Sequence, residues 1–223
     1  ATILDDGTAT AGNDADTIVD NDKPVLSIGD VTVEEGSAAV FAVSLDKATE
    51  ASWEVSFTAT PVTAEAGDIT TPLVVTYVDS SNVTQTLTPD VNGNYTVPAG
   101  VTTLSVSVPT TNDNVYEGAE TFTLSASVTD PVITATDTGT ATIKDDGTAT
   151  DGNDVNTTID NDLPTLTVAG VDNVSEGSYA VFTVTLDKAI EADTPIDLAL
   201  ADVTTESGDY TTYTVYTDPN DIS

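Results

Sequence analysis

The sequence predicts an all-β protein of tandem antiparallel β-sandwiches, and three observations lead to this fold class. Apolar residues alternate with small or polar residues in several short runs, as they do in strands with one buried face. Valine and threonine, both β-branched, dominate these runs, and no window has convincing helical periodicity. Short turn sequences rich in Gly, Asn and Asp separate the runs. Short strands spaced by such turns are typical of an antiparallel sandwich.

The strand runs follow one another through residues 39–128. Their inward-facing apolar residues are Phe41, Val43 and Leu45, then Val55 and Phe57, then Leu104, Val106 and Val108, and finally Phe122, Leu124, Ala126 and Val128. The turn sequences are Glu35-Gly36, Gly67-Asp68, Asn92-Gly93-Asn94, Pro98-Ala99-Gly100 and Asp145-Asp146-Gly147. Each run is short enough to be a single strand of a sandwich.

An internal repeat sets the domain organisation. Residues 1–10 recur almost unchanged as residues 141–150, and Glu35-Gly36-Ser37 recurs as Glu176-Gly177-Ser178. The second copy carries one additional residue between these two matches. A tandem array of similar domains is the simplest explanation.

The domain boundaries are predicted at Pro24 and Pro164, which follow each Asp-Asn-Asp sequence, because proline ends a strand and stiffens a junction. The four predicted parts are the tail of a preceding repeat with its linker (1–23), a complete sandwich (24–146), an Asp-rich linker (147–163) and the N-terminal part of the next repeat (164–223). The last part lacks counterparts of residues 95–143. Either further sequence or another chain would therefore complete it.

Composition excludes several classes of function. The chain has 38 Asp and Glu against 4 Lys and Arg, a formal net charge of −34, and neither His nor Cys. It therefore has no His-based acid/base pair, no thiol nucleophile and no disulfide, and we predict that it is not an enzyme. The charge disfavours binding to nucleic acid and anionic membranes, and no stretch is apolar enough to insert into a bilayer. The composition favours an extracellular protein.

The acidic residues gather at turns and repeat ends, and three interpretations compete. Asp and Asn favour turns because their side chains hydrogen-bond to nearby backbone. Negative charge also keeps a β-protein soluble and protects its strand edges. The third interpretation is a Ca²⁺ site, since this ion takes six to eight oxygen ligands. For the clusters we favour calcium, because adjacent carboxylates repel unless a cation bridges them.

Four short motifs in a fixed order resemble the Calx-β domain. They are Glu35-Gly36 before Phe41-x-Val43-x-Leu45, then Ala66-Gly67-Asp68, then residues 112–122, and then residues 142–146. Calx-β domains occur in sodium–calcium exchangers and, in tandem, in giant bacterial surface adhesins of the RTX type. The resemblance implies an immunoglobulin-like sandwich that serves as a repeat of such an adhesin.

The same resemblance implies a set of Ca²⁺ ligands, because calcium-binding members of that family hold the metal at one end of the sandwich. In the complete repeat the implied ligands are Glu35, Asp68, Asp113, Glu117, Asp145 and Asp146. The partial repeat carries Glu176 and Asp209, and the leading tail carries Asp5 and Asp6. Two acidic runs of the family are shortened here, to Asn112-Asp113-Asn114 and Asp145-Asp146-Gly147, so we expect one or two ions in each domain.

The functional hypothesis is a calcium-stiffened extender repeat on a bacterial cell surface, whose partners are the neighbouring repeats of the same polypeptide. Two alternatives stay open. One is a self-assembling extracellular filament or surface-layer subunit, in which other copies of the chain donate strands. The other is a Ca²⁺ sensor or a ligand-binding adhesin module. A sensor would change conformation at a defined Ca²⁺ concentration, whereas an extender would mainly gain stability.

Overall fold

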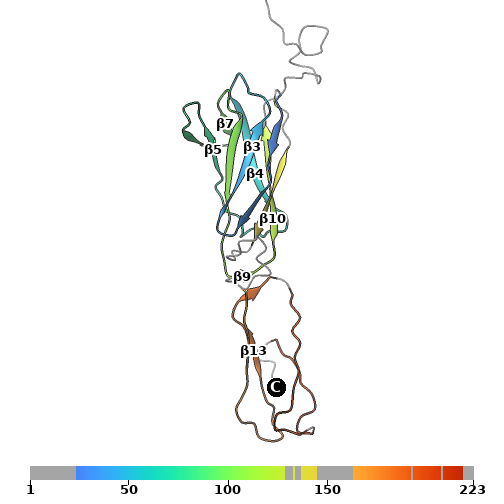
Figure 1. Ribbon diagram of the computed structural model, residues 1–223. Helices are drawn as coiled ribbons and strands as arrows, with labels where there is room; N and C mark the ends of the chain where they lie inside the picture. The colour runs from blue at the N-terminus through green and yellow to red at the C-terminus, as the bar shows by residue number, and fades with distance from the viewer. Residues whose placement is uncertain are drawn as a thin grey trace, which may run out of the picture. The chain divides into compact units, whose positions relative to one another are not determined.

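The computed structural model describes residues 24–128, 133, 137–144, 163–191, 193–206 and 208–217 (Figure 1). The chain divides into two compact units, residues 1–163 and residues 164–223. The described residues contain strands and turns but no helix, and hence none of the length and hydropathy needed to cross a membrane. The prediction of an all-β fold is confirmed.

The first unit is a sandwich of two five-stranded sheets. The first sheet has the order β1 (Leu26–Ile28), β3 (Ala38–Leu45), β8 (Thr103–Pro109), β5 (Val74–Val78) and β6 (Thr84–Leu87). The second sheet has the order β2 (Val31–Glu34), β11 (Thr138–Lys144), β10 (Glu120–Val128), β4 (Trp53–Pro61) and β7 (Tyr95–Val97). A short strand, β9 (Val115–Tyr116), lies between β8 and β10 along the chain. Neighbouring strands are antiparallel except β2 and β11, which are parallel.

The core of the first unit lies between the two sheets, where the predicted alternating residues meet. Strand β3 alternates strictly between exposed and buried positions, and Phe41 and Val43 are among its buried residues. Strand β10 contributes Phe122 and Leu124 from the opposite sheet, both fully buried. The rings of Phe41 and Phe122 meet edge to face, with centroids 5.8 Å apart. Aromatic pairs favour this geometry, which helps to fix the spacing of the two layers.

The chain changes sheets between β1 and β2, at Gly29 and Asp30. The last strand passes so close to this crossing that a Cβ atom on Gly139 would lie 2.6 Å from Ile28 Cγ2 and 2.7 Å from the carbonyl oxygen of Gly29. Only glycine therefore fits at position 139 without a shift of backbone. Asp30 Oδ1 accepts a hydrogen bond from the backbone N–H of Thr140 at 2.7 Å, which holds β11 to the crossing.

The second unit contains β12 (Leu166–Ala169), β13 (Thr183–Leu186) and β14 (Ala189–Ile190). Strands β12 and β13 are antiparallel and pair Leu166 with Leu186. The first unit pairs Leu26 with Leu45 at the corresponding position of β1 and β3. The internal repeat of the sequence is thus a repeat of strand register as well.

Candidate metal centre

The chain that follows β4, the segment after β8 and the start of β10 meet at one end of the first unit, where β4 and β11 finish. The chain that leaves β4 folds over the start of β10, because the N–H groups of Val62, Thr63 and Ala64 all donate to the carbonyl oxygen of Thr121, at 3.0, 3.0 and 3.1 Å. The loop before β5 is joined to the segment after β8 by a hydrogen bond of 2.8 Å from Thr111 N to Asp68 O. These backbone bonds fix the places from which the acidic side chains project.

The turn at Asp68 is closed by its own side chain. Asp68 Oδ2 accepts a hydrogen bond of 2.5 Å from the N–H of Glu65, and Asp68 N donates to the carbonyl oxygen of Glu65 at 3.3 Å. Asp side chains commonly close turns in this way. The turn buries the Asp68 side chain and directs it toward the start of β10.

Asp68, Glu117 and Glu120 form a group of three buried carboxylates. Their relative exposures are 7%, 9% and 6%, and each offers an oxygen atom within 4.8 Å of an oxygen of the other two. Ca²⁺ binds oxygen at 2.3–2.6 Å, so two of its ligands can be at most about 5 Å apart. The spacing of the three carboxylates is therefore compatible with shared coordination of one such ion.

The protonation of Glu120 shows how the group avoids carrying its full charge. Burial, a hydrogen bond with Asp68 and the negative charges of Glu65, Asp68 and Glu117 together raise the pKa of Glu120 to about 9. At neutral pH Glu120 therefore keeps its proton and donates the hydrogen bond to Asp68. A divalent cation would offset the same repulsion by replacing that proton.

Of the residues that the family resemblance implies and the structure describes, only Asp68 and Glu117 belong to this three-carboxylate group. Glu35 is buried at 8% exposure but lies outside the group. Asp113 is exposed, and its Oδ1 accepts a hydrogen bond from Val115 N at 2.8 Å, which closes a local turn.

The turn that carries Glu35 nevertheless approaches the loop that contains Asn112, Asp113 and Glu117, which we call the acidic loop. A Cβ atom on Gly36, whose φ is +70°, would lie 3.0 Å from Asn112 Cβ. In addition, the backbone N–H of Glu35 donates to the carbonyl oxygen of Lys144 at 2.8 Å. The early Glu-Gly turn, the acidic loop and the end of β11 therefore converge on one end of the sandwich.

Two of the remaining implied ligands belong to the second unit, and four are not among the described residues. Glu176 and Asp209 are exposed in the second unit. Asp209 Oδ2 accepts a hydrogen bond from Glu206 N at 2.9 Å, in the same turn geometry as Asp68. Asp5, Asp6, Asp145 and Asp146 lie outside the described residues.

Glu120 belongs to the group but was not implied by the sequence motifs. A signal was available, because Glu120 lies two residues before Phe122 and is therefore in phase with the buried positions of β10. A carboxylate at an inward-facing strand position requires a partner, a proton or a cation. Alternation alone could have marked Glu120 as a candidate ligand.

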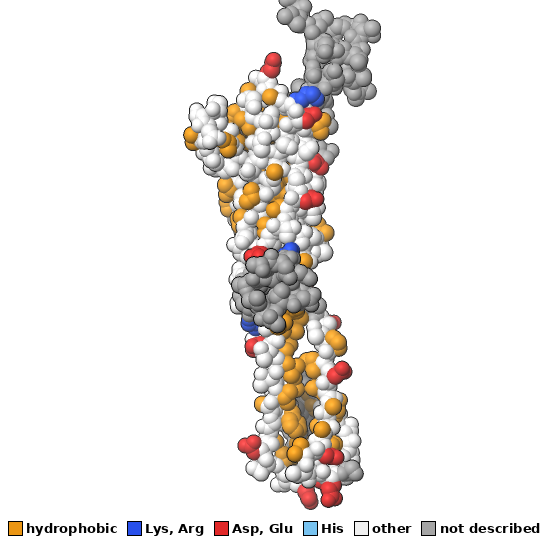
Figure 2. Space-filling model, in the orientation of Figure 1, with side chains coloured by type: hydrophobic (Ala, Val, Ile, Leu, Met, Phe, Trp, Pro, Cys, Tyr) orange, Lys and Arg blue, Asp and Glu red, His pale blue; other side chains and the backbone are white. Residues whose placement is uncertain are grey.

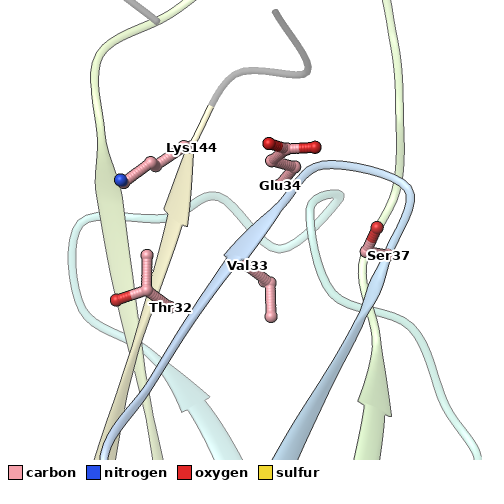
Figure 3. A pocket seen from close by; sticks show the side chains of 5 residues that line it. All are labelled: Thr32, Val33, Glu34, Ser37 and Lys144. Carbon is pink, nitrogen blue, oxygen red and sulfur yellow. The ribbon is translucent and has the colours of Figure 1, made fainter. Parts of the chain in front are cut away.

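A separate hollow of about 340 Å³ opens at the same end of the sandwich and is lined by β2, the turn after it and the end of β11. Figure 3 shows the side chains that line it: Thr32, Val33, Glu34, Ser37 and Lys144. Sites for organic ligands are mostly lined by apolar and aromatic side chains. This hollow is lined by one valine among small polar and charged residues, so its lining is not typical of a site for an organic ligand.

No model of a protein family matches the sequence, and no curated protein matches it. Among solved structures, the chain is similar to the apo form of the Calx CBD1 domain, with 19% identity and a TM-score of 0.41, over 55% of this chain and 97% of that one. It is also similar to the calcium binding domain CBD12 of CALX1.1, with 19% identity and a TM-score of 0.38, over 55% of this chain and 45% of that one. A non-cellulosomal cohesin from Archaeoglobus fulgidus has 11% identity and a TM-score of 0.31, over 54% and 91% of the two chains. These identities are too low to assign the chain to a family.

Proposed function

We propose that residues 24–146 are a calcium-binding structural repeat, and that Ca²⁺ at the end of the sandwich stiffens the domain. The observation that carries this proposal is the buried group of Asp68, Glu117 and Glu120, with oxygen atoms within 4.8 Å of one another. Three carboxylates in such a group are costly unless protons or a cation reduce their charge. Carboxylate oxygens are the ligands that Ca²⁺ prefers.

The three proposed ligands come from two parts of the chain that are far apart in the sequence, so one ion would tie these parts together. Asp68 lies in the chain between β4 and β5, Glu117 lies between β9 and β10, and Glu120 opens β10. Asp145 and Asp146 directly follow Lys144, the last residue of β11, and we propose them as further ligands. Strand β11 pairs with both β2 and β10, so an ion held there would also restrain the chain that leaves the domain.

We further propose that the repeat belongs to the extender region of a bacterial cell-surface adhesin and works outside the cell. The tandem repeat, the net charge of −34 and the lack of cysteine support this role. The partners would be the adjacent repeats of the same polypeptide. Without Ca²⁺, the carboxylates at the domain end repel and the loops loosen, whereas bound Ca²⁺ restrains the direction in which the linker leaves.

Thermal unfolding of the full chain, first in chelator and then with added Ca²⁺, tests the proposal. A ligand that binds only the folded state stabilises it by about 2.7 kcal/mol at 100 times its dissociation constant. We expect Ca²⁺ to raise the melting temperature of the first unit. Mg²⁺ should raise it less, because Mg²⁺ demands a near-ideal octahedron of closer ligands.

Two matched variants sharpen this experiment. Asp145→Asn combined with Asp146→Asn should reduce the effect of Ca²⁺ if these residues are ligands. The control is Glu54→Gln, because Glu54 is an exposed carboxylate of β4. An unchanged melting temperature at millimolar Ca²⁺ would contradict the proposal and leave the acidic residues with turn and solubility roles.

A further inference from the structure

The second unit has an apolar face that nothing covers among its described residues. It consists of Leu166, Val168, Phe182 and Leu186, all of which are 39% exposed or more. In the first unit the corresponding positions hold Leu26, Ile28, Phe41 and Leu45, and all of them are buried. The largest contrast is between Phe182, at 54% exposure, and Phe41, at 0%. We call these four residues of the second unit the open face.

Figure 2 shows hydrophobic side chains gathered in a band along the second unit, with Asp and Glu side chains at its margins. A contiguous apolar surface of this kind usually marks a site of contact with another polypeptide. The sparse charge within the band fits such a contact, since burying an unpaired carboxylate would oppose it.

The first unit shows what covers the same face when the sandwich is complete. Strand β8 pairs with the edge of β3, and the register places Leu104 opposite Val43 and Val106 opposite Phe41. The opposite sheet then places Phe122 against Phe41, with ring centroids 5.8 Å apart. The cover therefore consists of one strand added at the edge and one sheet added above the face.

The second unit already has the frame that would accept such a cover. Its β12 and β13 have the register of β1 and β3, with Leu166 opposite Leu186. Within the described part of this unit, β13 pairs with β12 alone, so its other edge offers unpaired backbone N–H and C=O groups. An extended segment can add to such an edge by strand addition.

We propose that the open face binds a β-segment with the apolar pattern of residues 103–144. One strand of this partner would present aliphatic residues in the alternation of Leu104 and Val106 and pair with the edge of β13. A second strand would place a large aromatic residue, in the position of Phe122, against Phe182. A third strand would carry glycine in the position of Gly139, where the first unit leaves no room for a side chain beside Phe41.

Cysteine cross-linking tests this pairing directly, since the natural chain contains no cysteine. Val184 is the repeat counterpart of Val43, so the full chain would carry Val184→Cys. The probe is a synthetic polypeptide of residues 103–144 with Leu104→Cys. A matched probe carries Ser105→Cys instead, because Ser105 pairs opposite Ala42 and points to the other face of the strand. We expect a several-fold excess of disulfide with the Leu104→Cys probe, and equal yields would overturn the proposal.

Further variants separate specific binding from general adhesion. Phe182→Asp in the chain and Phe122→Asp in the probe should each abolish the excess cross-linking. Val203→Asp is the control, because Val203 and its counterpart Val62 are exposed in both units. Fluorescence anisotropy of a labelled, cysteine-free probe gives a second readout, and we expect saturable binding to the natural chain. Cross-linking or binding that survives Phe182→Asp would overturn the proposal.

Discussion

The two units have the same local structure but differ sharply in burial. In the first unit, Asp46 Oδ1 accepts a hydrogen bond from Val25 N at 2.6 Å, and in the second, Asp187 Oδ1 accepts one from Thr165 N at 2.5 Å. Yet the central phenylalanine of β3 is fully buried, whereas its counterpart beside β13 is half exposed. Strand register and the capping hydrogen bond from the Asp side chain are therefore encoded locally in each repeat. Burial, in contrast, depends on strands that come later in the sequence.

The acidic turns of the two units also share a local structure and differ in burial. Asp68 and Asp209 both close a turn by accepting a backbone hydrogen bond from the glutamate three residues earlier. Asp68 is buried beside Glu117 and Glu120, whereas Asp209 is exposed. The turn and calcium interpretations are therefore compatible, because Asp68 closes its own turn and also lies beside Glu117 and Glu120.

The largest expected effect tests the contrast in burial. Phe41→Ala should destabilise the first unit by about 3–5 kcal/mol, the usual cost of truncating a fully buried phenylalanine. Phe182→Ala should leave the stability of the first unit unchanged. Urea unfolding monitored by the fluorescence of Trp53 reports this unit selectively, since Trp53 is the single tryptophan of the chain and is buried in β4. A comparable loss in both variants would show that the units do not differ in this way.

The next largest effect concerns Glu120, because its loss would leave the three-carboxylate group with two members. Glu120→Gln should remove most of the roughly 2.7 kcal/mol that Ca²⁺ provides at 100 times its dissociation constant. In the natural chain, Ca²⁺ should also displace the proton of Glu120. Its apparent affinity should therefore rise by up to about tenfold per pH unit below pH 9. Calcium titrations between pH 6 and pH 8, with a pH indicator dye in weak buffer, measure both quantities.

The ion-free chain provides a check on the sign of this effect. The folded-state pKa of Glu120, about 9, lies above its ordinary value of 4.5, so the folded state holds a proton that the unfolded state releases. Stability in chelator should therefore decrease as the pH rises from about 4.5 to 9. Glu120→Gln should weaken this decrease, and Glu54→Gln should not. If almost no protons were released when Ca²⁺ binds at pH 7, this result would contradict the role of Glu120.

Much of the fold could be predicted from the sequence, because alternation is a local signal. Phe41, Val43 and Leu45 marked a strand with one buried face, and β3 contains all three in that arrangement. The parallel pairing of β2 with β11 could not be predicted, since it joins residues more than a hundred positions apart. Nothing within either strand specifies its partner.

The candidate site could be predicted only in part, for a related reason. Asp68 and Glu117 lie in recognisable turn motifs, whereas Glu120 lies within a strand, where a carboxylate does not form a motif. Its significance depends on Asp68, which is far away in the sequence and is brought beside it by the turn after β4. Asp113 lies in an acidic run that implied a ligand, and its exposed side chain closes a local turn, so its role as a ligand stays a prediction.

The sheet crossing of the first unit gives a smaller expected effect. Gly139→Ala should destabilise this unit by about 1–3 kcal/mol, because the new methyl group would meet backbone at the carbonyl oxygen of Gly29, which cannot move aside cheaply. Gly118→Ala is the matched control, since a Cβ atom on Gly118 would have no neighbour within 4 Å and its φ is not positive. Urea unfolding in chelator measures the stability of both variants. Equal effects would show that the crossing tolerates a side chain.

The smallest effect should be the one that the two units share. Backbone hydrogen bonds lower the pKa of Asp46 and of Asp187, chiefly those from Val25 and Thr165 respectively. A lowered folded-state pKa means that each bond stabilises its unit above the ordinary carboxyl pKa and that this contribution is lost as the pH falls through the folded-state value. Asp46→Asn and Asp187→Asn should therefore speed amide exchange at Val25 and Thr165 near neutral pH, with little difference from the natural chain in acid. Hydrogen exchange followed by NMR measures both amides in one sample. Because the cap is local, the change should be similar in the two units despite their different burial, and a change confined to the first unit would mean that the cap depends on the completed core.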